Sequence, residues 1–216
     1  MNRRYDLIVF DWDGTLMDSE RKIVRCMSAA AADLGLNDPG TNAIRHIIGL
    51  GLDEAMQELF PAADATLRTS LTQRYREHFL SLDQTQMTLF PGVADGLEKL
   101  AHDGFLLAVA TGKARRGLDK VLDETGTRRF FSATRCADEA FSKPHPKMLE
   151  DILDQTGVER ERVLMVGDTV YDMQMARNAG VPGLAVSYGV HAREQLLECQ
   201  PLACVDSFVE VCAWLA

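Results

Sequence analysis

The sequence predicts an α/β protein whose parallel-sheet core is interrupted by one all-helical segment. Two short apolar runs, at 5–10 and 163–167, end abruptly in acidic residues, as buried central strands do when they carry polar groups at their carboxyl ends. From 93 onward, apolar runs alternate with segments of helical periodicity, which indicates a parallel sheet covered on both faces. Between 19 and 82, by contrast, the pattern is helical throughout.

The helical segment follows the first strand, after a loop at Gly14. Its first apolar residues recur at spacings of three and four, which predicts a helix. They are Ile23, Met27, Ala30, Ala31 and Leu34. An Asn-Asp-Pro-Gly sequence at 37–40 then breaks the chain. We expect further helices at 41–48, 52–60 and 64–80, with no convincing strand among them.

Strand and helix alternate after the Phe-Pro-Gly break at 90–92. We expect strands near 105–110, 131–135, 163–167, 183–187 and 203–205. We expect helices near 93–102, 114–124, 146–155, 171–179, 191–198 and 207–215. The chain is therefore predicted to divide into a discontinuous core, 1–17 and 84–216, and an inserted helical domain at 18–83.

Composition and charge restrict the classes of partner. The chain has 216 residues and a formal net charge of −9, whereas nucleic acids and anionic membranes attract basic surfaces. We therefore expect neither nucleic acid nor a membrane as a partner. The apolar run before Asp11 is too short for a signal peptide or a membrane span, and five cysteines without a CxxC pair suit reduced thiols. The expected location is the cytoplasm.

Two acidic clusters follow two of the predicted strands. Asp11 and Asp13 come after the first strand, and Asp168 and Asp172 come after the run at 163–167. If these strands are neighbours, the four residues converge at the sheet edge where open α/β sheets bind ligands. Carboxylates held together need a balancing cation or proton, and an oxygen-rich site suits Mg²⁺. The first cluster alone could be a solvated turn, but the second favours a metal site.

A hydroxyl, flexible amides and a cation follow the strand at 105–110, in Thr111, Gly112 and Lys113. Such groups suit a phosphoryl group, although an ordinary helix-starting turn is the other interpretation. Lys143 lies in a loop stiffened by two prolines. An ammonium held there would screen an anionic nucleophile from an incoming phosphate; an exposed lysine without a function is the alternative.

These motifs, in this order, resemble the haloacid dehalogenase superfamily, and the match spans nearly the whole chain. They are the Asp-Trp-Asp-Gly-Thr-Leu sequence at 11–16, Thr111, Lys143, and the Gly-Asp-Thr-Val-Tyr-Asp sequence at 167–172. The resemblance implies a Rossmann-like doubly wound parallel sheet. It also identifies the insertion at 18–83 as that family's helical cap.

The resemblance further implies a reaction, the Mg²⁺-dependent hydrolysis of phosphomonoesters through an aspartyl phosphate. Asp11 would be the nucleophile, and Asp13 would be the general acid and then the general base. Mg²⁺ would be held by the Asp11 side chain, the Asp13 backbone carbonyl and Asp168. Asp172 would support the metal site through water or through Lys143.

The remaining site residues would bind the substrate, a small phosphorylated metabolite. By the resemblance, Thr111 and Gly112 would hold the phosphoryl group, and Lys143 would stabilise the transferring charge. Arg45 and the Gly-Leu-Gly turn at 49–51 resemble the cap recognition region of phosphoglycolate-phosphatase-like members, where a cation can meet a substrate carboxylate. A solvated arginine and an ordinary helix-ending turn are the alternatives. Phosphoglycolate is the favoured substrate.

Two other functions remain open at this point. A sugar-phosphate mutase of the phosphoglucomutase type would use the same aspartyl phosphate and return the group to sugar. A non-catalytic module that binds a phosphorylated ligand would keep the motifs without turnover. The dehalogenase and phosphonate-cleaving branches that resemble this chain lack an aspartate at the position of Asp13, so their chemistry is disfavoured. A phosphoester oxygen leaves poorly without a proton, and Asp13 could supply one.

Overall fold

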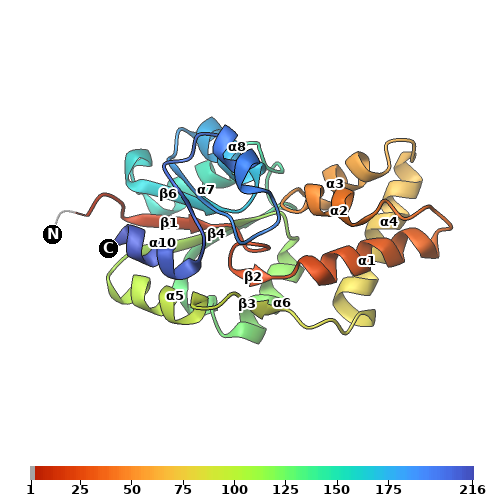
Figure 1. The fold of residues 1–216 in the computed structure, drawn as a ribbon, viewed down its shortest axis with the longest axis horizontal. Coiled ribbons are helices and arrows are strands. Elements are labelled where there is room, and N and C mark those ends of the chain that lie inside the picture. The colour runs from red at the N-terminus through yellow and green to blue at the C-terminus, as the bar shows by residue number, and fades with distance from the viewer. Residues whose placement is uncertain (1–2) are drawn as a thin grey trace.

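The computed structural model describes residues 3–216, which form a parallel sheet, helices on both of its faces, and a helical segment beyond the carboxyl ends of the strands (Figure 1). The strands of the sheet are β1 (Leu7–Phe10), β4 (Leu106–Thr111), β5 (Phe131–Cys136), β6 (Val163–Gly167), β7 (Gly183–Val186) and β8 (Cys204–Val205). Their order is β5-β4-β1-β6-β7-β8, and every pairing is parallel. The predicted α/β fold is confirmed.

Two helical layers bury the sheet. One contains α5 (Val93–His102), α6 (Arg115–Thr125) and α10 (Phe208–Leu215), and the other contains α7 (Lys147–Thr156) and α8 (Val170–Ala179). The helix α9 (Arg193–Glu198) packs beside β7, and short 3₁₀ helices cover Arg128–Phe130 and Arg160–Arg162. Each of these α-helices was predicted from the sequence, with small differences in its bounds.

The central strand β1 shows why the sheet needs both layers. Its side chains alternate between the two faces, as the geometry of a strand requires. Ile8 and Phe10 pack on the side of α5 and α10, whereas Leu7 and Val9 pack on the side of α7 and α8. All four are fully buried, and each such side chain contributes about 1.5–3 kcal/mol by leaving water.

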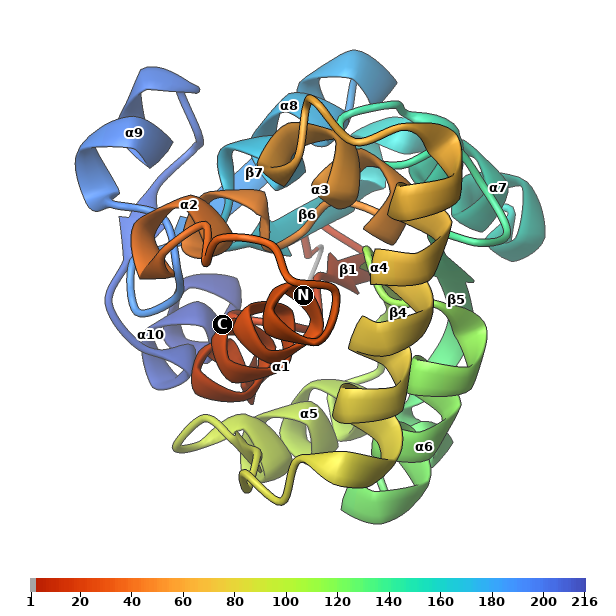
Figure 2. The same ribbon diagram turned by 90° about the vertical axis from the view of Figure 1, so that its right-hand side faces the viewer.

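The helical segment consists of α1 (Glu20–Asp33), α2 (Thr41–Ile47), α3 (Leu52–Leu59), α4 (Ala65–Glu77) and a π-helical turn at His78–Leu82. These helices surround an apolar cluster of their own, which includes Met27, Ile44, Met56 and Leu71. Figure 2 looks onto this segment, with α1 and α4 toward the viewer. The helix predicted at 64–80 is thus divided between α4 and the π-helical turn. No helix within residues 3–216 has both the length and the apolarity needed to cross a membrane.

A short antiparallel ribbon joins the helical segment to the sheet. It consists of β2 (Met17–Asp18) and β3 (Thr88–Leu89), and the backbone N–H of Phe90 donates to the carbonyl of Leu16 at 3.0 Å beside it. The sequence did not predict this ribbon, because two-residue strands carry no detectable periodicity. The chain therefore leaves the core and returns to it at one place.

Candidate active site

The carboxyl ends of three neighbouring strands bring the predicted motifs together. β1 pairs with both β4 and β6. Asp11 directly follows β1, Thr111 ends β4, and Asp168 directly follows β6. All three side chains are fully buried. The neighbouring strands expected from the acidic clusters are therefore present.

Lys143 is buried between two of the acidic residues. Its Nζ lies 2.6 Å from Oδ1 of Asp11 and 2.6 Å from Oδ1 of Asp172, and 1% of the residue is exposed. Burial on its own would lower the pKa of Lys143, but the charges of Asp11 and Asp172 outweigh it and raise the pKa overall. Lys143 is thus a fixed ammonium inside the site and not the exposed lysine of the alternative interpretation.

Asp172 is fixed by the start of α8 as well as by Lys143. The backbone N–H and the hydroxyl of Thr169 donate to its Oδ2 at 3.0 and 2.7 Å. Together with the bond from the Asp172 backbone N–H to the Thr169 hydroxyl, this forms a capping box at the helix N-terminus. Both carboxylate oxygens of Asp172 therefore have partners, and the side chain has little freedom.

Asp168 lies in a tight cradle. Its Oδ1 accepts a hydrogen bond from the Thr15 hydroxyl at 2.8 Å, and its Oδ2 accepts one from the backbone N–H of Val190 at 2.8 Å. The backbones of Gly14 and Gly189 come so close that a Cβ atom at either would overlap this carboxylate. Burial, with the charge of Asp172, raises the pKa of Asp168 to about 7.

The buried acidic residues form a cluster that fits a divalent cation. One carboxylate oxygen from each of Asp11, Asp168 and Asp172 lies within 4.8 Å of the others. Within residues 3–216, Oδ2 of Asp11 is buried and has no hydrogen-bond partner. Burial raises the pKa of Asp11 well above its usual range; Lys143 opposes this, and the charges of Asp172 and Asp168 add to it. Three carboxylates against one ammonium leave an excess of negative charge, which a hard cation with oxygen ligands would balance.

Asp13 is held apart from this cluster. Its Oδ1 accepts a hydrogen bond from the Ser19 hydroxyl at 2.6 Å and lies 2.8 Å from Nζ of Lys113. Its carboxylate is therefore not one of the three that could hold a cation, and a role for its backbone carbonyl stays a prediction. The Thr111 hydroxyl accepts from the backbone N–H of Lys113 at 3.2 Å, and its contact with a phosphoryl group stays a prediction.

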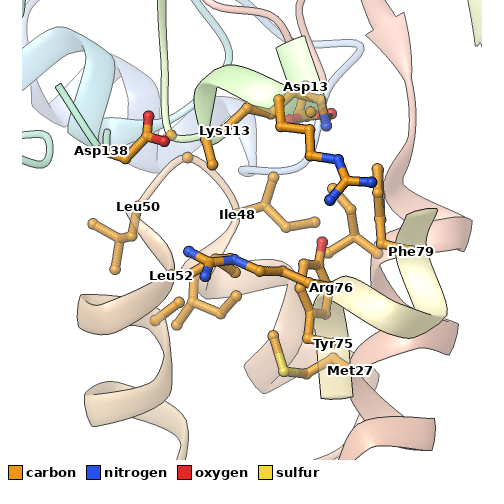
Figure 3. Close-up of a pocket in the computed structure, with 18 of the residues that line it drawn as sticks. Asp13, Met27, Ile48, Leu50, Leu52, Tyr75, Arg76, Phe79, Lys113 and Asp138 are labelled. Atoms are coloured by element: carbon orange, nitrogen blue, oxygen red, sulfur yellow. Dashed lines mark ion pairs between the residues drawn. The ribbon is translucent and has the colours of Figure 1, made fainter. Parts of the chain in front are cut away.

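A cavity of about 340 Å³ separates the sheet from the helical segment. Asp11, Asp13, Gly112 and Lys113 line it on the side of the sheet. The helical segment supplies Ile23, Met27, Ile47, Ile48, Gly49, Leu50, Leu52, Ala55, Tyr75, Arg76, Phe79 and Leu80. Figure 3 shows Asp13 and Lys113 on one side of this space, with Met27, Leu52 and Tyr75 on the opposite side. The candidate reacting groups thus face a partly enclosed space.

The turn at 49–51 closes this cavity against the sheet. A Cβ atom on Gly112 would lie 2.6 Å from the carbonyl oxygen of Gly49 and would overlap that of Leu50. The backbone N–H of Gly51 donates to the Ser142 hydroxyl at 2.8 Å. The turn therefore contacts both loops that carry the predicted phosphoryl-binding residues.

Arg45 lies outside the residues that line the cavity. Its guanidinium donates to the backbone carbonyl of Val190 at 3.1 Å and lies 3.5 Å from the carboxylate of Glu20. The cations that do line the cavity are Lys113, Arg76 and Arg116. Contact of Arg45 with a substrate stays a prediction, and the structure gives this arginine a contact between the helical segment and the loop after β7.

Sequence reasoning missed several residues of the site. Tyr75 and Phe79 lie four residues apart on one helical face, which is also the spacing of ordinary core residues. Arg76 resembles any exposed helical arginine, and Ser19 resembles a helix cap. The Thr-Gly-Lys motif gave a signal for Lys113, but not for its pairing with Asp13. These contacts depend on how the helical segment sits on the sheet, which local patterns do not contain.

The chain is similar in sequence to a known family and to several curated phosphatases. The family described as haloacid dehalogenase-like hydrolase matches residues 8–186. The chain is 36% identical over 210 residues to the "Probable phosphatase IndB" of Dickeya dadantii, covering 95% of this chain and 91% of that protein. It is 31% identical to a phosphoglycolate phosphatase of Aliivibrio fischeri, covering 97% and 96%, and 30% identical to a 5'-nucleotidase of Pseudomonas aeruginosa, covering 92% and 90%.

A solved structure shows the same fold. The crystal structure of a predicted phosphoglycolate phosphatase from Haemophilus somnus 129PT superposes with a TM-score of 0.91 at 23% identity, covering 100% of both chains. The family match contains all the motif residues, from Asp11 to Asp172, and these residues meet at one sheet edge. The chain therefore belongs to the haloacid dehalogenase-like hydrolase family and is a phosphatase of that family.

Proposed function

We propose that this protein is a Mg²⁺-dependent phosphatase that hydrolyses small phosphomonoesters through an aspartyl phosphate on Asp11. The observation that carries the proposal is the asymmetry of the Asp11 carboxylate. Lys143 holds Oδ1 at 2.6 Å, whereas Oδ2 is buried without a partner. A desolvated carboxylate oxygen beside the cavity is suited to attack phosphorus. Burying a polar atom without a hydrogen-bond partner lowers the stability of the fold, so such an atom at this place favours a catalytic role.

The metal would be held by Asp11, Asp168 and, directly or through Lys143, Asp172. The close approach of their oxygens and the excess negative charge support this assignment. When bound, Mg²⁺ would supply positive charge that orients the phosphoryl oxygens and offsets their repulsion from Asp11. The Asp13 backbone carbonyl is proposed as a further ligand.

The covalent step forms one bond and breaks another. A carboxylate oxygen of Asp11 bonds to phosphorus while the ester oxygen leaves with its electron pair and takes a proton from Asp13. Water then attacks the same phosphorus, Asp13 accepts a proton from it, and the Asp11–phosphorus bond breaks to release inorganic phosphate. General acid and base catalysis of this kind contributes about 10²–10⁴-fold.

Thr111 and Lys143 would act on the phosphoryl group. The Thr111 hydroxyl can donate to one phosphoryl oxygen, with the amide N–H groups that follow it near the same place. Lys143 would offset the charge that moves from Asp11 to the phosphoryl oxygens. Gly112 lets the cap turn at 49–51 approach this group closely, because a side chain there would overlap the turn.

The substrate class that we propose is the small phosphomonoester. Curated relatives include phosphoglycolate phosphatases and a 5'-nucleotidase, which supports a small phosphorylated metabolite without selecting one. The sequence favours phosphoglycolate because Arg45 and the turn at 49–51 resemble a recognition region; Gly49 and Leu50 line the cavity, whereas Arg45 does not. We further propose the boundaries 1–17 and 84–216 for the core and 18–83 for the cap, and a cytoplasmic location, which the five free thiols support.

The test is phosphate release from a panel of phosphomonoesters, measured with Mg²⁺ and with a chelator. We expect turnover that needs Mg²⁺ and that falls at least about 10³-fold in Asp11→Asn. Asp95→Asn, which changes an exposed carboxylate on α5, is the matched control and should keep the parent rate. Equal turnover by Asp11→Asn would exclude Asp11 as the nucleophile. Isomerisation of a sugar phosphate that requires an added sugar bisphosphate and releases no phosphate would favour a mutase.

A further inference from the structure

The cavity wall opposite the reacting carboxylates is apolar. Every lining residue that comes from α1, α2, α3 and the turn after α2 is uncharged: Ile23, Met27, Ile47, Ile48, Gly49, Leu50, Leu52 and Ala55. The π-helical turn adds Phe79 and Leu80 to the same wall, and α4 adds Arg76 and Tyr75, whose hydroxyl points toward the sheet side (Figure 3). A substrate held by its phosphoryl group at Asp11 would therefore direct its leaving alcohol at hydrocarbon.

The charged groups of the cavity lie elsewhere. Lys113 is on the sheet side, where it pairs with Asp13 at 2.8 Å and lies 4.6 Å from the centroid of the Phe79 ring. Arg76 and Arg116 are exposed, as is Asp138. Figure 3 shows the side chain of Arg76 extending across the view toward Leu52. The part of the wall formed by α1, α2 and α3 offers no cation to a carboxylate, so losing hydration there is costly.

The cavity is also larger than a two-carbon leaving group requires. Its volume of about 340 Å³ falls within the range of about 300–1,000 Å³ that is typical of sites for drug-sized ligands. Glycolate would fill little of it, and the apolar wall would stay in contact with water. A larger apolar group would displace that water and gain the corresponding hydrophobic free energy.

We propose that the substrate is a phosphomonoester whose leaving alcohol carries a bulky, uncharged apolar group, bound against the wall formed by Met27, Leu52 and Tyr75 (Figure 3). This inference rests on the proposed function for the position of the phosphoryl group. It differs from that function in the substrate that it selects, because it ranks an apolar group above the carboxylate of phosphoglycolate. Leu52, which is partly buried, is the proposed specificity-determining residue.

The experiment measures binding by calorimetry in the presence of Mg²⁺, with phosphonates that cannot be hydrolysed. The series is propyl-, pentyl- and heptylphosphonate, and 3-phosphonopropionate represents a carboxylate of the size of phosphoglycolate. We expect the affinity to rise about threefold to fourfold for each added methylene that the wall buries. The carboxylate compound should bind no more tightly than propylphosphonate.

Two variants locate the effect. Leu52→Gln keeps the size of the side chain and places an amide in the wall, so the affinity ratio of heptyl- to propylphosphonate should fall about threefold or more. Leu59→Gln is the matched control, because Leu59 is also a partly buried leucine of α3 but does not line the cavity. It should keep the parent ratio.

The outcomes separate this inference from the proposed function. An affinity that rises with alkyl chain length, and rises less in Leu52→Gln, supports the inference. If the matching alkyl phosphates release no phosphate, the hydrolase proposal is overturned, but this inference about binding is not. Affinities that do not change with chain length, or tighter binding of 3-phosphonopropionate than of heptylphosphonate, overturn the inference. Binding of none of the phosphonates overturns it as well.

Discussion

Nζ of Lys113 lies 2.8 Å from Oδ1 of Asp13, and the same oxygen accepts a hydrogen bond from the Ser19 hydroxyl at 2.6 Å. Both partners meet one oxygen, so they fix the rotation of the carboxylate. The Phe79 ring lies 4.6 Å from the ammonium and contributes a cation–π contact. The proposed general acid is thus oriented jointly by the sheet loop, the base of α1 and the end of the helical segment.

We expect Asp13→Asn to lower kcat by about 10²–10⁴-fold on alkyl phosphates, because an alkoxide leaves poorly without a proton. The loss should be much smaller on p-nitrophenyl phosphate, whose leaving group is stable as an anion. Steady-state kinetics on both substrates measures the difference. Equal losses on the two substrates would contradict a role for Asp13 in protonating the leaving group.

Lys113→Met tests whether the ammonium acts through Asp13. If it positions that carboxylate, the variant should show the same dependence on the leaving group as Asp13→Asn, with a smaller loss of up to about 10²-fold. Kinetics on the same two substrates checks this. A loss that is equal for both substrates, or seen only in KM, would instead indicate direct binding of substrate by Lys113.

Lys143→Met should destabilise the metal-free protein by about 3–5 kcal/mol, because it leaves the buried carboxylates of Asp11 and Asp172 without their ammonium. Urea unfolding in the presence of a chelator measures the change. The control is Lys99→Met, which removes an exposed ion pair with Asp103 and should cost no more than about 1 kcal/mol. Similar losses in the two variants would refute the special role of the buried pair.

Stability should depend on pH in a direction set by Asp168. Its folded pKa of about 7 lies above the ordinary value of 3.8, so the folded state binds more protons between these values, and stability falls as the pH rises from about 4 to 7. The raised pKa of Asp11 acts in the same direction. Melting temperatures with a chelator should therefore fall over this range.

Mg²⁺ should counteract this effect, since it favours the ionised carboxylates. The increase in melting temperature on adding Mg²⁺ is expected to be larger at pH 8 than at pH 5. Asp168→Asn should weaken both the fall with pH and the gain from Mg²⁺. A melting temperature of the metal-free protein that rises between pH 5 and 8 would contradict this account.

Gly112→Ala should impair turnover, because the new Cβ would lie 2.6 Å from the carbonyl oxygen of Gly49 and would force the cap turn away from the sheet. A displacement of about 1 Å near reacting groups can cost about 10²-fold in rate. Gly117→Ala is the matched control, since Gly117 also lines the cavity but its Cβ position has no heavy atom within 4 Å apart from its chain neighbours and the backbone of its own helix. Kinetics at saturating Mg²⁺ compares the two, and unchanged turnover in Gly112→Ala would show that the turn moves freely.

The sheet and its motifs could be predicted because their signals are local. The apolar runs that became β1 and β6 end in Asp11 and Asp168, and parallel strands place such ends at one edge. Lys143 is 132 residues from Asp11 in sequence; its two-proline loop left a functional role and an exposed lysine open, and the resemblance assigned it to the site. Its burial between two carboxylates followed from the structure alone.

The cavity could not be predicted in the same way. Tyr75 and Phe79 carry the spacing of core residues, and which of their neighbours face the sheet depends on the angle between the helical segment and the core. Arg45 is the opposite case, because it carries a sequence signal but does not line the cavity. Its sequence context indicates substrate recognition, which stays a prediction; the contacts of Arg45 with Glu20 and the backbone of Val190 followed from the structure alone.

The ribbon of β2 and β3 allows the segment between these two strands to be exchanged. Met17 pairs with Leu89 and Asp18 with Thr88, so the outgoing and incoming strands are already in register as the stem of a hairpin. Any insert whose two ends fit this stem could be spliced between them, and a short turn could replace the insert entirely, without disturbing the register of the sheet. The same α/β core could thus carry different inserted domains that recognise different substrates, each joined to it through the β2–β3 stem.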